Sequence, residues 1–554
     1  MKSRIITTLA QPVKWTVAVP GSKSLMNRAL LCAALATGRS ILKYPVFCDD
    51  TNYMIAALRS LGVHIQRHAQ TVTVFGCGGR FRAKTKKIYI GNAGTVMRFL
   101  TPFVPTGVQL IGNQRMQQRP LVDLQNAVQT LRQIGQKNNI KITGRVSSQF
   151  ISALLMYAPT LRRTIIISVS DKIVSAPYIQ MTIELMRRFG VNVQQRGRRF
   201  TIRPQKYRAT KYEIEGDASS ATYWWALAAI TRSHITVTNV PVTSRQPDIR
   251  FLNIMRRMGC TVKGTTVVGP WNKPLKPIRL AMADCPDAVM SVAIVAALAP
   301  GISQINQIHH LVAKESNRLR ALQLNLRRLG ISARATTRAL TIIGRNQVLW
   351  PATIKTHSDH RLAMAFAILG LACDGVSIDE PACVKKSYPT FWSDFTAAQR
   401  LAHKQHLIIT GMRGVGKTTY GKALAQQLKR SFIDLDQAIE QRVHQSTAQY
   451  VKQYGWPAFR EQEHLALQAV LKKPAGIIAT GGGTLMYSRN QKLIQAHYVV
   501  LLTTPLSVIE QRLANQAQRP TLLPQSQSVK SELRTVWRLR KDKYFAVADA
   551  ICRV

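Results

Sequence analysis

The stretch Met186-Arg187-Arg188-Phe189-Gly190-Val191-Asn192-Val193 carries a signal from which the architecture can be read. Its arginines oppose the negative end of a helix dipole, and its glycine can adopt the left-handed conformation that ends a helix. Two valines of high strand propensity follow at once. The sequence therefore predicts a helix that ends at Gly190, after which the chain enters a β-strand.

The same phrase recurs four more times, as Leu-Arg-Ser-Leu-Gly (58–62), Leu-Arg-Gln-Ile-Gly (131–135), Met-Arg-Arg-Met-Gly (255–259) and Leu-Arg-Arg-Leu-Gly (326–330). The five copies lie 73, 55, 69 and 71 residues apart. A period near 70 is too long for a solenoid repeat and suits a repeated α/β unit of several strands and two helices. The short interval predicts that one hairpin is missing between Gly135 and Val146.

The charge of the chain is unusual. Its 554 residues include 77 Lys and Arg but only 26 Asp and Glu, which gives a formal net charge of +51. Such a charge predicts nonspecific adhesion to nucleic acid. The basic residues are spread along the chain and form no long tail, so a general surface bias is favoured over a specific nucleic-acid partner.

Several features favour a cytoplasmic protein. Residues 1–21 contain no continuous apolar segment of the kind found in signal peptides. The eight cysteines form no C-x-x-C pair and no Cys/His cluster, which suits reduced thiols. The longest apolar runs, at 289–298 and 362–373, are too short to span a bilayer and are predicted to be buried helices. No membrane association is expected.

A second pattern begins after residue 400. Apolar strands are expected at 406–410, 432–435, 476–479 and 498–502. Strands that alternate with helices favour a parallel sheet. The polar stretch 396–405 separates the two patterns, and its residues 399–405 are the predicted linker.

Gly411-Met412-Arg413-Gly414-Val415-Gly416-Lys417-Thr418 follows the first of these strands and opens a helix predicted from Lys417 to Leu428. The stretch matches G-x-x-x-x-G-K-[ST], in which backbone N–H groups surround the phosphates of a nucleotide. The lysine reaches the β- and γ-phosphates, and the threonine binds Mg²⁺. ATP and Mg²⁺ are therefore predicted ligands, although the motif does not identify the phosphoryl acceptor.

Anion-binding features recur through the first 400 residues. Pro20-Gly21-Ser22-Lys23-Ser24 precedes a predicted helix that contains Arg28, and Gly91-Asn92-Ala93-Gly94-Thr95 precedes Arg98. Each places backbone N–H groups and a cation at a helix start, an arrangement that suits an anion. Taken singly, each is equally well explained as a capped helix.

The order of the motifs resembles 5-enolpyruvylshikimate-3-phosphate (EPSP) synthase over nearly all of residues 1–398. The resemblance is carried by Pro-Gly-Ser-Lys-Ser-x-x-Asn-Arg-Ala-Leu (20–30), Gly-Asn-Ala-Gly-Thr-x-x-Arg (91–98), Ser-Ser-Gln-Phe (147–150), Gly-Asp-Ala-Ser-Ser-Ala (216–221), Lys-Glu-Ser-x-Arg (314–318) and Asp-His-Arg-x-Ala-Met (359–364). The sister family, UDP-N-acetylglucosamine enolpyruvyl transferase, shares the fold and phosphoenolpyruvate but not this constellation.

The resemblance implies an α/β fold of six βαβαββ units in two lobes. One lobe would comprise residues 20–216, and the other residues 1–19 together with 217–398. The active site would lie between the lobes, which close on substrate. A P-loop kinase domain with a parallel sheet would follow at 406–554.

The resemblance also implies that two anionic substrates bind side by side without a metal. Asp287 would be the base at the 5-hydroxyl of shikimate 3-phosphate, Glu315 would protonate the methylene carbon of phosphoenolpyruvate, and Lys23 would lie near both. The residues implied for shikimate 3-phosphate are Lys23, Ser24, Arg28, Ser147, Ser148, Gln149, Ser175, Tyr178, Asp287 and Lys314. The residues implied for phosphoenolpyruvate are Lys23, Asn92, Gly94, Thr95, Arg98, Arg119, Gln149, Arg318, His360, Arg361 and Lys386. In this family the herbicide glyphosate occupies the phosphoenolpyruvate pocket.

The chain departs from the family pattern at several positions. Asn317 replaces an Asp, Gln118 a common Glu, His310 a common Asn, and Phe99 a frequent Pro. The shortened region 136–146 is expected to remove an edge hairpin without harm, because the Ser-Ser-Gln motif follows it directly.

Further motifs around the P-loop resemble shikimate kinase, whereas adenylate and gluconate kinases share only the P-loop. The motifs are Asp434-Leu435-Asp436, Phe459-Arg460 with Glu463, Gly481-Gly482-Gly483, and Arg519-Pro520 with Leu522. The resemblance implies ATP contacts from Gly411, Gly414, Gly416, Lys417, Thr418, Thr419, Arg512 and Arg519. It implies shikimate contacts from Asp436, Arg460, Gly481, Gly482, Gly483 and Arg540, and Mg²⁺ contacts from Thr418 and Asp434.

Three kinase residues have implied catalytic roles. Lys417 and the lid residue Arg519 would stabilise the transferring phosphoryl group, and Asp436 would help to activate the 3-hydroxyl of shikimate. Arg512 would stack on adenine, or it is an ordinary solvated helix residue.

Together the two resemblances predict a bifunctional enzyme with small-molecule substrates, in which the kinase product is the transferase substrate. Two alternatives stay open, a chain with one active domain and a basic nucleic-acid-binding protein on degenerate enzyme scaffolds. Asp287, Glu315 and Asp436 favour the enzyme, because binding nucleic acid needs no carboxylates.

Overall fold

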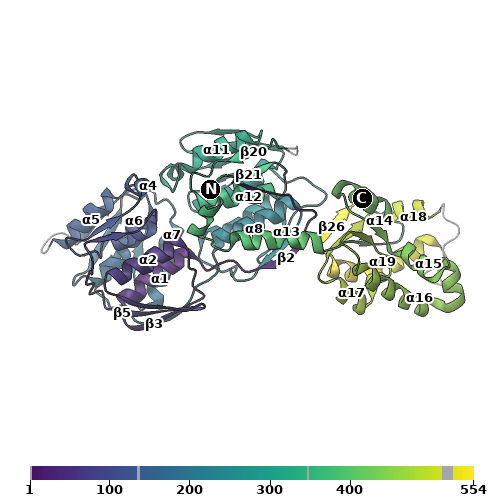
Figure 1. Cartoon of the computed structure of the whole chain (residues 1–554), viewed down its shortest axis with the longest axis horizontal. Coiled ribbons are helices and arrows are strands. Elements are labelled where there is room, and N and C mark those ends of the chain that lie inside the picture. The colour runs from purple at the N-terminus through teal and green to yellow at the C-terminus, as the bar shows by residue number, and fades with distance from the viewer. Residues whose placement is uncertain (1–2, 134–137, 346–348, 515–527) are drawn as a thin grey trace.

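The computed structural model describes residues 3–133, 138–345, 349–514 and 528–554. Two lobes and a C-terminal domain follow one another along the long axis of the molecule (Figure 1). Within the described residues, the two lobes hold six small sheets, four of them four-stranded, one three-stranded and one two-stranded. The predicted α/β class and repeated unit are confirmed.

The first lobe contains three of these sheets. The first pairs β3 (Thr37–Lys43), β4 (His64–Arg67), β5 (Thr71–Cys77) and β12 (Lys211–Glu213), with α1 (Lys23–Leu35) and α2 (Asp49–Ser60). The second pairs β6 (Lys87–Tyr89) with β7 (Gln109–Ile111), beside α3 (Gly94–Leu100), α4 (Gln114–Gln117) and α5 (Val122–Arg132). The third pairs β8 (Asn139–Ile142), β9 (Ile165–Val169), β10 (Gln194–Arg196) and β11 (Arg199–Ile202), with α6 (Ser148–Tyr157) and α7 (Pro177–Arg188).

The second lobe repeats the arrangement. One sheet contains β2 (Lys14–Val17), β13 (His234–Val237), β14 (Thr261–Lys263) and β15 (Thr266–Val268), with α8 (Ala218–Thr231) and α9 (Phe251–Arg257). Another contains β16 (Arg279–Ala281), β17 (Gly301–Asn306), β18 (Ser332–Ala335) and β19 (Ala339–Gly344), with α10 (Val289–Ala297) and α11 (Arg318–Arg328). The last contains β1 (Arg4–Ile5), β20 (Ala352–Ile354) and β21 (Val376–Ile378), with α12 (His360–Gly370).

The helix-ending glycines behave as the repeated phrase predicts. Gly62, Gly190, Gly259 and Gly330 all have positive φ, between 78° and 99°. Each lies directly after a helix whose last turn carries arginine. The fifth glycine, Gly135, lies outside the described residues.

The short repeat interval also has a structural counterpart. In the described residues after α5, the next strand is β8, which pairs with β9 of the neighbouring sheet. The β6–β7 sheet has no antiparallel hairpin among the described residues, whereas β4–β5, β10–β11, β14–β15 and β18–β19 provide one in the four-stranded sheets.

Each lobe has its own hydrophobic core. One core is built from residues between Leu25 and Ile214, and the other from Ile6, Val17 and Val19 with residues between Ala218 and Ala398. At the centre of the second lobe, α8, α10 and α12 pack against one another. Helices that are apolar on all sides must be buried, and the two apolar runs predicted as buried helices form α10 and α12.

The C-terminal domain has a five-stranded parallel sheet in the order β23-β24-β22-β25-β26. Its strands are β22 (Leu407–Gly411), β23 (Phe432–Asp434), β24 (Ile477–Ala479), β25 (Tyr498–Thr503) and β26 (Ala550–Arg553). Its helices are α14 (Lys417–Leu428), α15 (Leu435–Val443), α16 (Thr447–Leu471), α17 (Ser488–Ile494), α18 (Leu506–Ala514) and α19 (Val529–Val547). The predicted parallel sheet is confirmed. No helix of the described ranges is both long and apolar enough to cross a membrane.

The predicted linker has a different form. Helix α13 spans Phe391–Lys404, so most of residues 399–405 continue a helix instead of forming an irregular connection. The stretch is polar because one face of this helix is exposed, while Phe391, Phe395, Ala398 and Ala402 are buried. An amphipathic surface helix and a linker share a polar composition.

Candidate active sites

The two lobes touch around the residues that the sequence singles out. Lys386 of the second lobe reaches the first lobe, where its Nζ donates to Asp50 (2.8 Å) and to the Asn92 carbonyl (2.9 Å). Arg115 of the first lobe donates to the carbonyls of Lys314 (2.9 Å) and Glu315 (3.2 Å) in the second. These contacts bring groups more than 150 residues apart in the sequence into one site.

Asp50 is a member of this site that the sequence reasoning missed. It lies in the first turn of α2 and is 2% exposed. Lys23, the first residue of α1, donates to it at 2.9 Å, opposite Lys386. Burial alone would raise the pKa of Asp50, but the two ammonium groups hold it below its ordinary value. The scarcity of Asp and Glu in this chain, 26 residues in all, is the signal that could have found it.

The second lobe presents a network of carboxylates and arginines. Arg318 begins α11, and its guanidinium contacts Asp359 (2.8 Å), Glu315 (2.6 Å) and Asp287 (3.0 Å). Arg361 also contacts Asp287, at 2.8 Å. Asp359 caps α12 by accepting the Arg361 backbone N–H, and its carboxylate also accepts from the Arg318 guanidinium.

The charges of this network fix the protonation states. Burial would raise the pKa of Asp287 and of Glu315, because it disfavours the carboxylate form. Arg361, Lys314 and Arg318 outweigh burial at Asp287, and Arg318, Arg119 and Lys386 outweigh it at Glu315, so both pKa values lie below the ordinary range. Burial lowers the pKa of Lys314 to about 8, which leaves this cation easily neutralised.

A second cluster of cations lies at the start of α3. Arg98 donates to Gln149 Oε1 (2.7 Å), and Gln149 donates to the Thr95 hydroxyl (3.0 Å). Arg119 donates to both oxygens of Asn92, each at 3.3 Å, and lies 3.9 Å from Glu315.

Two other predicted members lie deep in this part of the site. A Cβ added at Gly94 would lie 2.6 Å from the Arg119 guanidinium carbon, so glycine permits a close approach. His360 is fully buried with neither ring nitrogen hydrogen-bonded. Burial and the nearby Lys23 and Arg361 hold its pKa well below the ordinary value, so its imidazole is neutral.

Several residues expected around shikimate 3-phosphate lie at the starts of α6 and α7 and in the turn before α7. Ser147 caps α6, Ser148 is its first residue, and Ser175 has a left-handed backbone (φ 57°) and donates to the Ala283 carbonyl of the second lobe. Tyr178 donates to Asp287 at 3.3 Å and to Asp248 at 3.4 Å. Asp248 is another buried member that the sequence reasoning missed.

Arg28 lies among internal partners. It donates to the Thr182 hydroxyl (2.7 Å) and to the Ser24 carbonyl (2.9 Å), and it is 2% exposed. Burial lowers its pKa to about 10. Phe99, one of the family departures, packs beneath this guanidinium with 5.0 Å between charge and ring centre.

Two other departures keep a local role. Asn317 caps α11 by accepting the Arg320 backbone N–H at 3.2 Å, a role that Asn and Asp fill equally. Gln118 accepts from Arg115 at 3.2 Å. His310 differs, because it is 7% exposed and neither ring nitrogen has a hydrogen-bond partner.

In the C-terminal domain, the P-loop runs from the end of β22 to the start of α14. Gly411, Gly414 and Gly416 all have positive φ (147°, 76° and 101°), which residues with a side chain rarely adopt, so the turn depends on glycine. Lys417 Nζ donates to the carbonyls of Gly411 (3.1 Å) and Met412 (3.0 Å). Thr419 follows on α14.

Thr418 and Asp434 provide a pair of oxygens suited to a small divalent cation. The Thr418 hydroxyl donates to Asp434 at 2.6 Å, and the second Asp434 oxygen accepts the Asp436 backbone N–H at 3.0 Å. Oxygen atoms are the ligands that Mg²⁺ prefers. The residues present therefore fit the expected ion.

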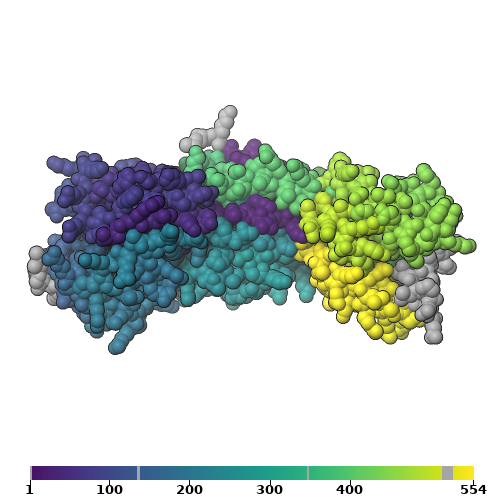
Figure 2. Space-filling model, turned by 90° about the horizontal axis from the view of Figure 1, so that it is seen from below, coloured from purple at the N-terminus to yellow at the C-terminus, as the bar shows by residue number. Residues whose placement is uncertain are grey.

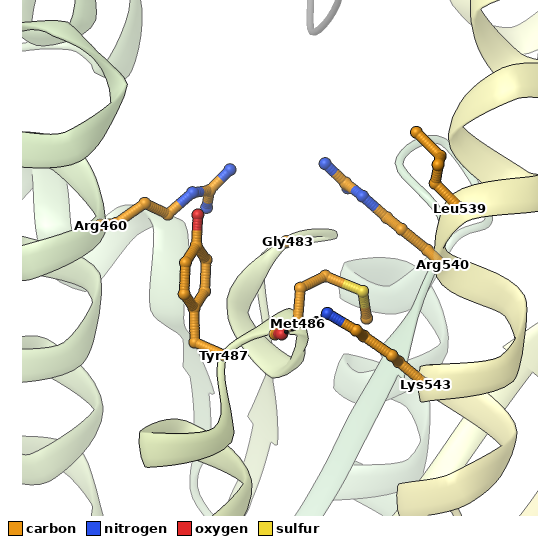
Figure 3. A pocket seen from close by; sticks show the side chains of 7 residues that line it. All are labelled: Arg460, Gly483, Met486, Tyr487, Leu539, Arg540 and Lys543. Atoms are coloured by element: carbon orange, nitrogen blue, oxygen red, sulfur yellow. Dashed lines mark hydrogen bonds between the residues drawn. The ribbon is translucent and has the colours of Figure 1, made fainter.

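Beside the P-loop lies a cavity of about 280 Å³ (Figure 3). Arg460 and Tyr487 stand on one side, Leu539, Arg540 and Lys543 on the other, with Gly483 and Met486 between them. Glu463 binds Arg460 at 2.7 Å and is 1% exposed. The two arginines face each other across the opening, which suits a small anionic or hydroxyl-rich ligand.

The three glycines after β24 allow charged groups to converge there. A Cβ at Gly481 would lie 2.6 Å from Asp436 Oδ1, and one at Gly483 would lie 2.6 Å from the Arg460 guanidinium. The Gly482 carbonyl accepts from Arg540 at 2.8 Å and from the Tyr544 hydroxyl. Glycine at 481 and 483 therefore lets the Asp436 carboxylate and the Arg460 guanidinium pack directly against the backbone.

Arg512 and Arg519 are the two arginines predicted to contact ATP. Arg512 donates to the P-loop carbonyls of Gly414 (3.4 Å) and Val415 (3.0 Å). It thus lies at the nucleotide loop. Arg519 lies outside the described residues.

Comparison with known proteins agrees with this geometry. Residues 8–395 match the family model of EPSP synthase (3-phosphoshikimate 1-carboxyvinyltransferase), and residues 413–554 match that of shikimate kinase. A solved EPSP synthase from Acinetobacter baumannii covers 72% of this chain and 97% of its own, with TM-score 0.60 and 23% identity. The enolpyruvyl transferase NikO from Streptomyces tendae covers 72% of this chain and 97% of its own, with TM-score 0.54 and 14% identity. These two likenesses concern the fold.

Curated relatives extend over both regions. A pentafunctional AROM polypeptide from Schizosaccharomyces pombe is 35% identical over 92% of this chain, and one from Yarrowia lipolytica is 33% identical over 97%. The chain spans only 37% and 38% of the length of these relatives. The chain therefore belongs to the EPSP synthase family, and a shikimate kinase domain follows its transferase region in tandem.

Proposed function

We propose that the chain catalyses two consecutive steps of the shikimate pathway. The kinase domain transfers the γ-phosphoryl group of ATP to the 3-hydroxyl of shikimate. The transferase region then adds the 5-hydroxyl of shikimate 3-phosphate to C2 of phosphoenolpyruvate and eliminates phosphate. The convergence of cations from both lobes around Asp287 and Glu315 is the observation that carries this proposal.

In the transferase, the clustered charges serve two polyanions that must lie side by side. Lys23, Lys314 and Lys386 supply ammonium groups, and the arginines supply planar pairs of donors that suit carboxylate and phosphate oxygens. These donors are held in place before substrate arrives, so they stabilise charge that develops in the transition state without reorganising. This site needs no metal in the proposed reaction.

Asp287 acts as the base at the 5-hydroxyl, since its low pKa keeps it ionised. Glu315 donates the proton to the methylene carbon, although in the free protein it too is ionised. Arg119 and Arg318 are the cations that hold its pKa down. When an anionic substrate engages them, their effect on Glu315 weakens, and its pKa rises toward the value that a general acid requires.

In the kinase, Lys417 and the P-loop N–H groups hold the phosphates of ATP, and Asp436 orients the acceptor hydroxyl. Arg460 and Arg540 bind shikimate in the cavity between them. Thr418 and Asp434 would hold Mg²⁺, which supplies charge stabilisation to the phosphates when bound. Arg512 steadies the loop through its carbonyls.

One coupled assay of the full chain tests the proposal. With shikimate, ATP, Mg²⁺ and phosphoenolpyruvate, the wild-type chain should release ADP and phosphate in equal amounts. Lys417→Ala should stop ADP formation yet still release phosphate when shikimate 3-phosphate is supplied. Asp287→Asn should still form ADP from ATP and shikimate but should release no phosphate from phosphoenolpyruvate. A wild-type chain that forms neither product, or a folded Lys417→Ala chain that loses both activities, would contradict the proposal.

A further inference from the structure

The second lobe of the transferase and the kinase domain share a buried contact around Trp271. This side chain follows β15 of the second lobe and is only 8% exposed. It does not join the second-lobe core. It belongs instead to the hydrophobic cluster that contains Leu407, Tyr498 and Val500 of the kinase sheet. A transferase residue therefore completes the kinase core.

Tyr498 ties the same contact together by hydrogen bonds. Its hydroxyl accepts from Trp271 Nε1 (3.0 Å) and donates to the Arg232 carbonyl at the end of α8 (2.7 Å). The two rings lie 5.7 Å apart between centres. Tyr498 is fully buried and Trp271 nearly so, and loss of the Tyr498 hydroxyl would leave the buried Trp271 Nε1–H without its partner, which costs more than the bond itself contributes.

Charged and polar groups surround this apolar centre. Asp549, 9% exposed, binds Lys14 (3.0 Å) and His234 (2.9 Å) of the second lobe and accepts the Val499 backbone N–H (2.9 Å). Asn272 donates to the Ile551 carbonyl at 3.3 Å. Residues of both β25 and β26 are thus hydrogen-bonded to the second lobe.

The covalent connection is also held firmly. Only Gln405 and His406 separate α13 from β22. The Gln405 side chain donates to the Lys14 carbonyl (2.7 Å) and accepts the Lys14 backbone N–H (3.0 Å). Figure 2 shows the N-terminal segment that carries β2 meeting the C-terminal domain. The domains are therefore not joined by a loose tether.

We propose that the second lobe is a structural part of the kinase domain, which depends on it to keep the kinase sheet folded. The contact lies at the N-terminal ends of β22 and β25, whereas Gly411 and Asp434 stand at the C-terminal ends of their strands. A five-residue strand spans about 17 Å. The contact thus fixes the kinase with its catalytic edge turned away from the transferase and without touching that edge.

Hydrogen exchange of the full chain tests this dependence, since it reads the opening of individual strands without using either activity. Trp271→Ala is expected to speed exchange in β22 and β25 by at least about a hundredfold, the scale set by Trp→Ala changes in cores. The matched control is Trp350→Ala, because Trp350 lies in the same lobe but is 66% exposed. The control should leave β22 and β25 protected.

The possible outcomes are distinct. Unchanged protection of β22 and β25 in Trp271→Ala, or an equal loss in the control, would overturn the proposal. So would a loss that extends to β13 and β17, because Trp271 would then support the second lobe itself. Complete loss of protection confined to the kinase strands would support it.

A milder variant serves if Trp271→Ala unfolds too much. Tyr498→Phe keeps the ring and removes both hydrogen bonds, so exchange in β25 should quicken by about tenfold, as expected for unpairing buried polar groups. The same protection as wild type would count against the proposal. The term kinase domain rests on the proposed function. The hydrogen-exchange test does not, because it measures the protection of strands and would hold even if the chain had no kinase activity.

Discussion

Asp50 joins a cation of each lobe, and Asp50→Asn is the perturbation that tests its role. Its two oxygens face Lys23 of the first lobe at 2.9 Å and Lys386 of the second at 2.8 Å. All three side chains are largely buried. The amide removes the charge with little change in volume and leaves two buried ammonium groups facing an uncharged partner.

The expected loss is large for a single isosteric change. Breaking a buried ion pair by removing one partner costs about 3–5 kcal/mol. For folding units of roughly 150–250 residues, 1 kcal/mol corresponds to about 2–4 °C in Tm. Asp50→Asn should therefore lower the Tm of the transferase region by about 6–20 °C at pH 7, measured by calorimetry of the full chain.

Measurements at lower pH and with added phosphate test whether the loss of the Asp50 charge causes the fall in Tm. The pKa of Asp50 lies below its ordinary value, so its contribution is present above pH ~4 and is lost as the pH falls through the folded-state pKa. The difference between wild type and variant should therefore shrink in acid. Inorganic phosphate should stabilise the variant more than wild type, because an added anion can replace the missing carboxylate.

Asp284→Asn is the control for this prediction. Asp284 forms an exposed pair with Arg250 at 3.1 Å, and Asp284→Asn should cost less than about 1 kcal/mol. If Asp50→Asn costs no more than this control at pH 7, the reasoning about the buried bridge is wrong.

Three more predictions concern the transferase. Asp287→Asn and Glu315→Gln should each lower kcat by at least about a hundredfold, since each removes a proton-transfer group; near-normal phosphate release by either folded variant would exclude that residue from the mechanism. Burial lowers the pKa of Lys314 to about 8, so kcat/KM for shikimate 3-phosphate should fall above pH ~8 as the ammonium is lost. Lys314→Arg should flatten that profile, and identical profiles would contradict the assignment. In Gly94→Ala the new methyl would lie 2.6 Å from the Arg119 guanidinium, so affinity for phosphoenolpyruvate should fall and that for the longer glyphosate should fall more; equal relative losses, seen in the inhibition constants, would refute the pocket assignment.

Short-range features of this protein could be predicted because the signals are local. A glycine that ends a helix adopts its positive φ through contacts with its own helix, so four of the repeated phrases sufficed to locate helix ends. The P-loop is likewise a local backbone conformation, and helix α14 begins and ends at the predicted residues, Lys417 and Leu428.

The candidate sites were only partly predictable. Motifs give the types of side chain, but pairing across lobes depends on how the lobes meet. Asp50 gave no motif of its own, and its contact with Lys386, 336 positions away, is seen only in the folded chain. The helical form of the predicted linker was not predictable for a related reason, because composition does not reveal that one face of α13 is buried.

The sequence by itself thus determined the repeated α/β units, the nucleotide loop and the family to which the residues belong, since helix ends, hydrophobic periodicity and motif order are encoded along the chain. Only the tertiary structure decided which charges neutralise one another and where Trp271 is buried. Electrostatic and packing energies depend on distance in space, and residues such as Trp271 and Tyr498, 227 positions apart, meet only after the chain has folded.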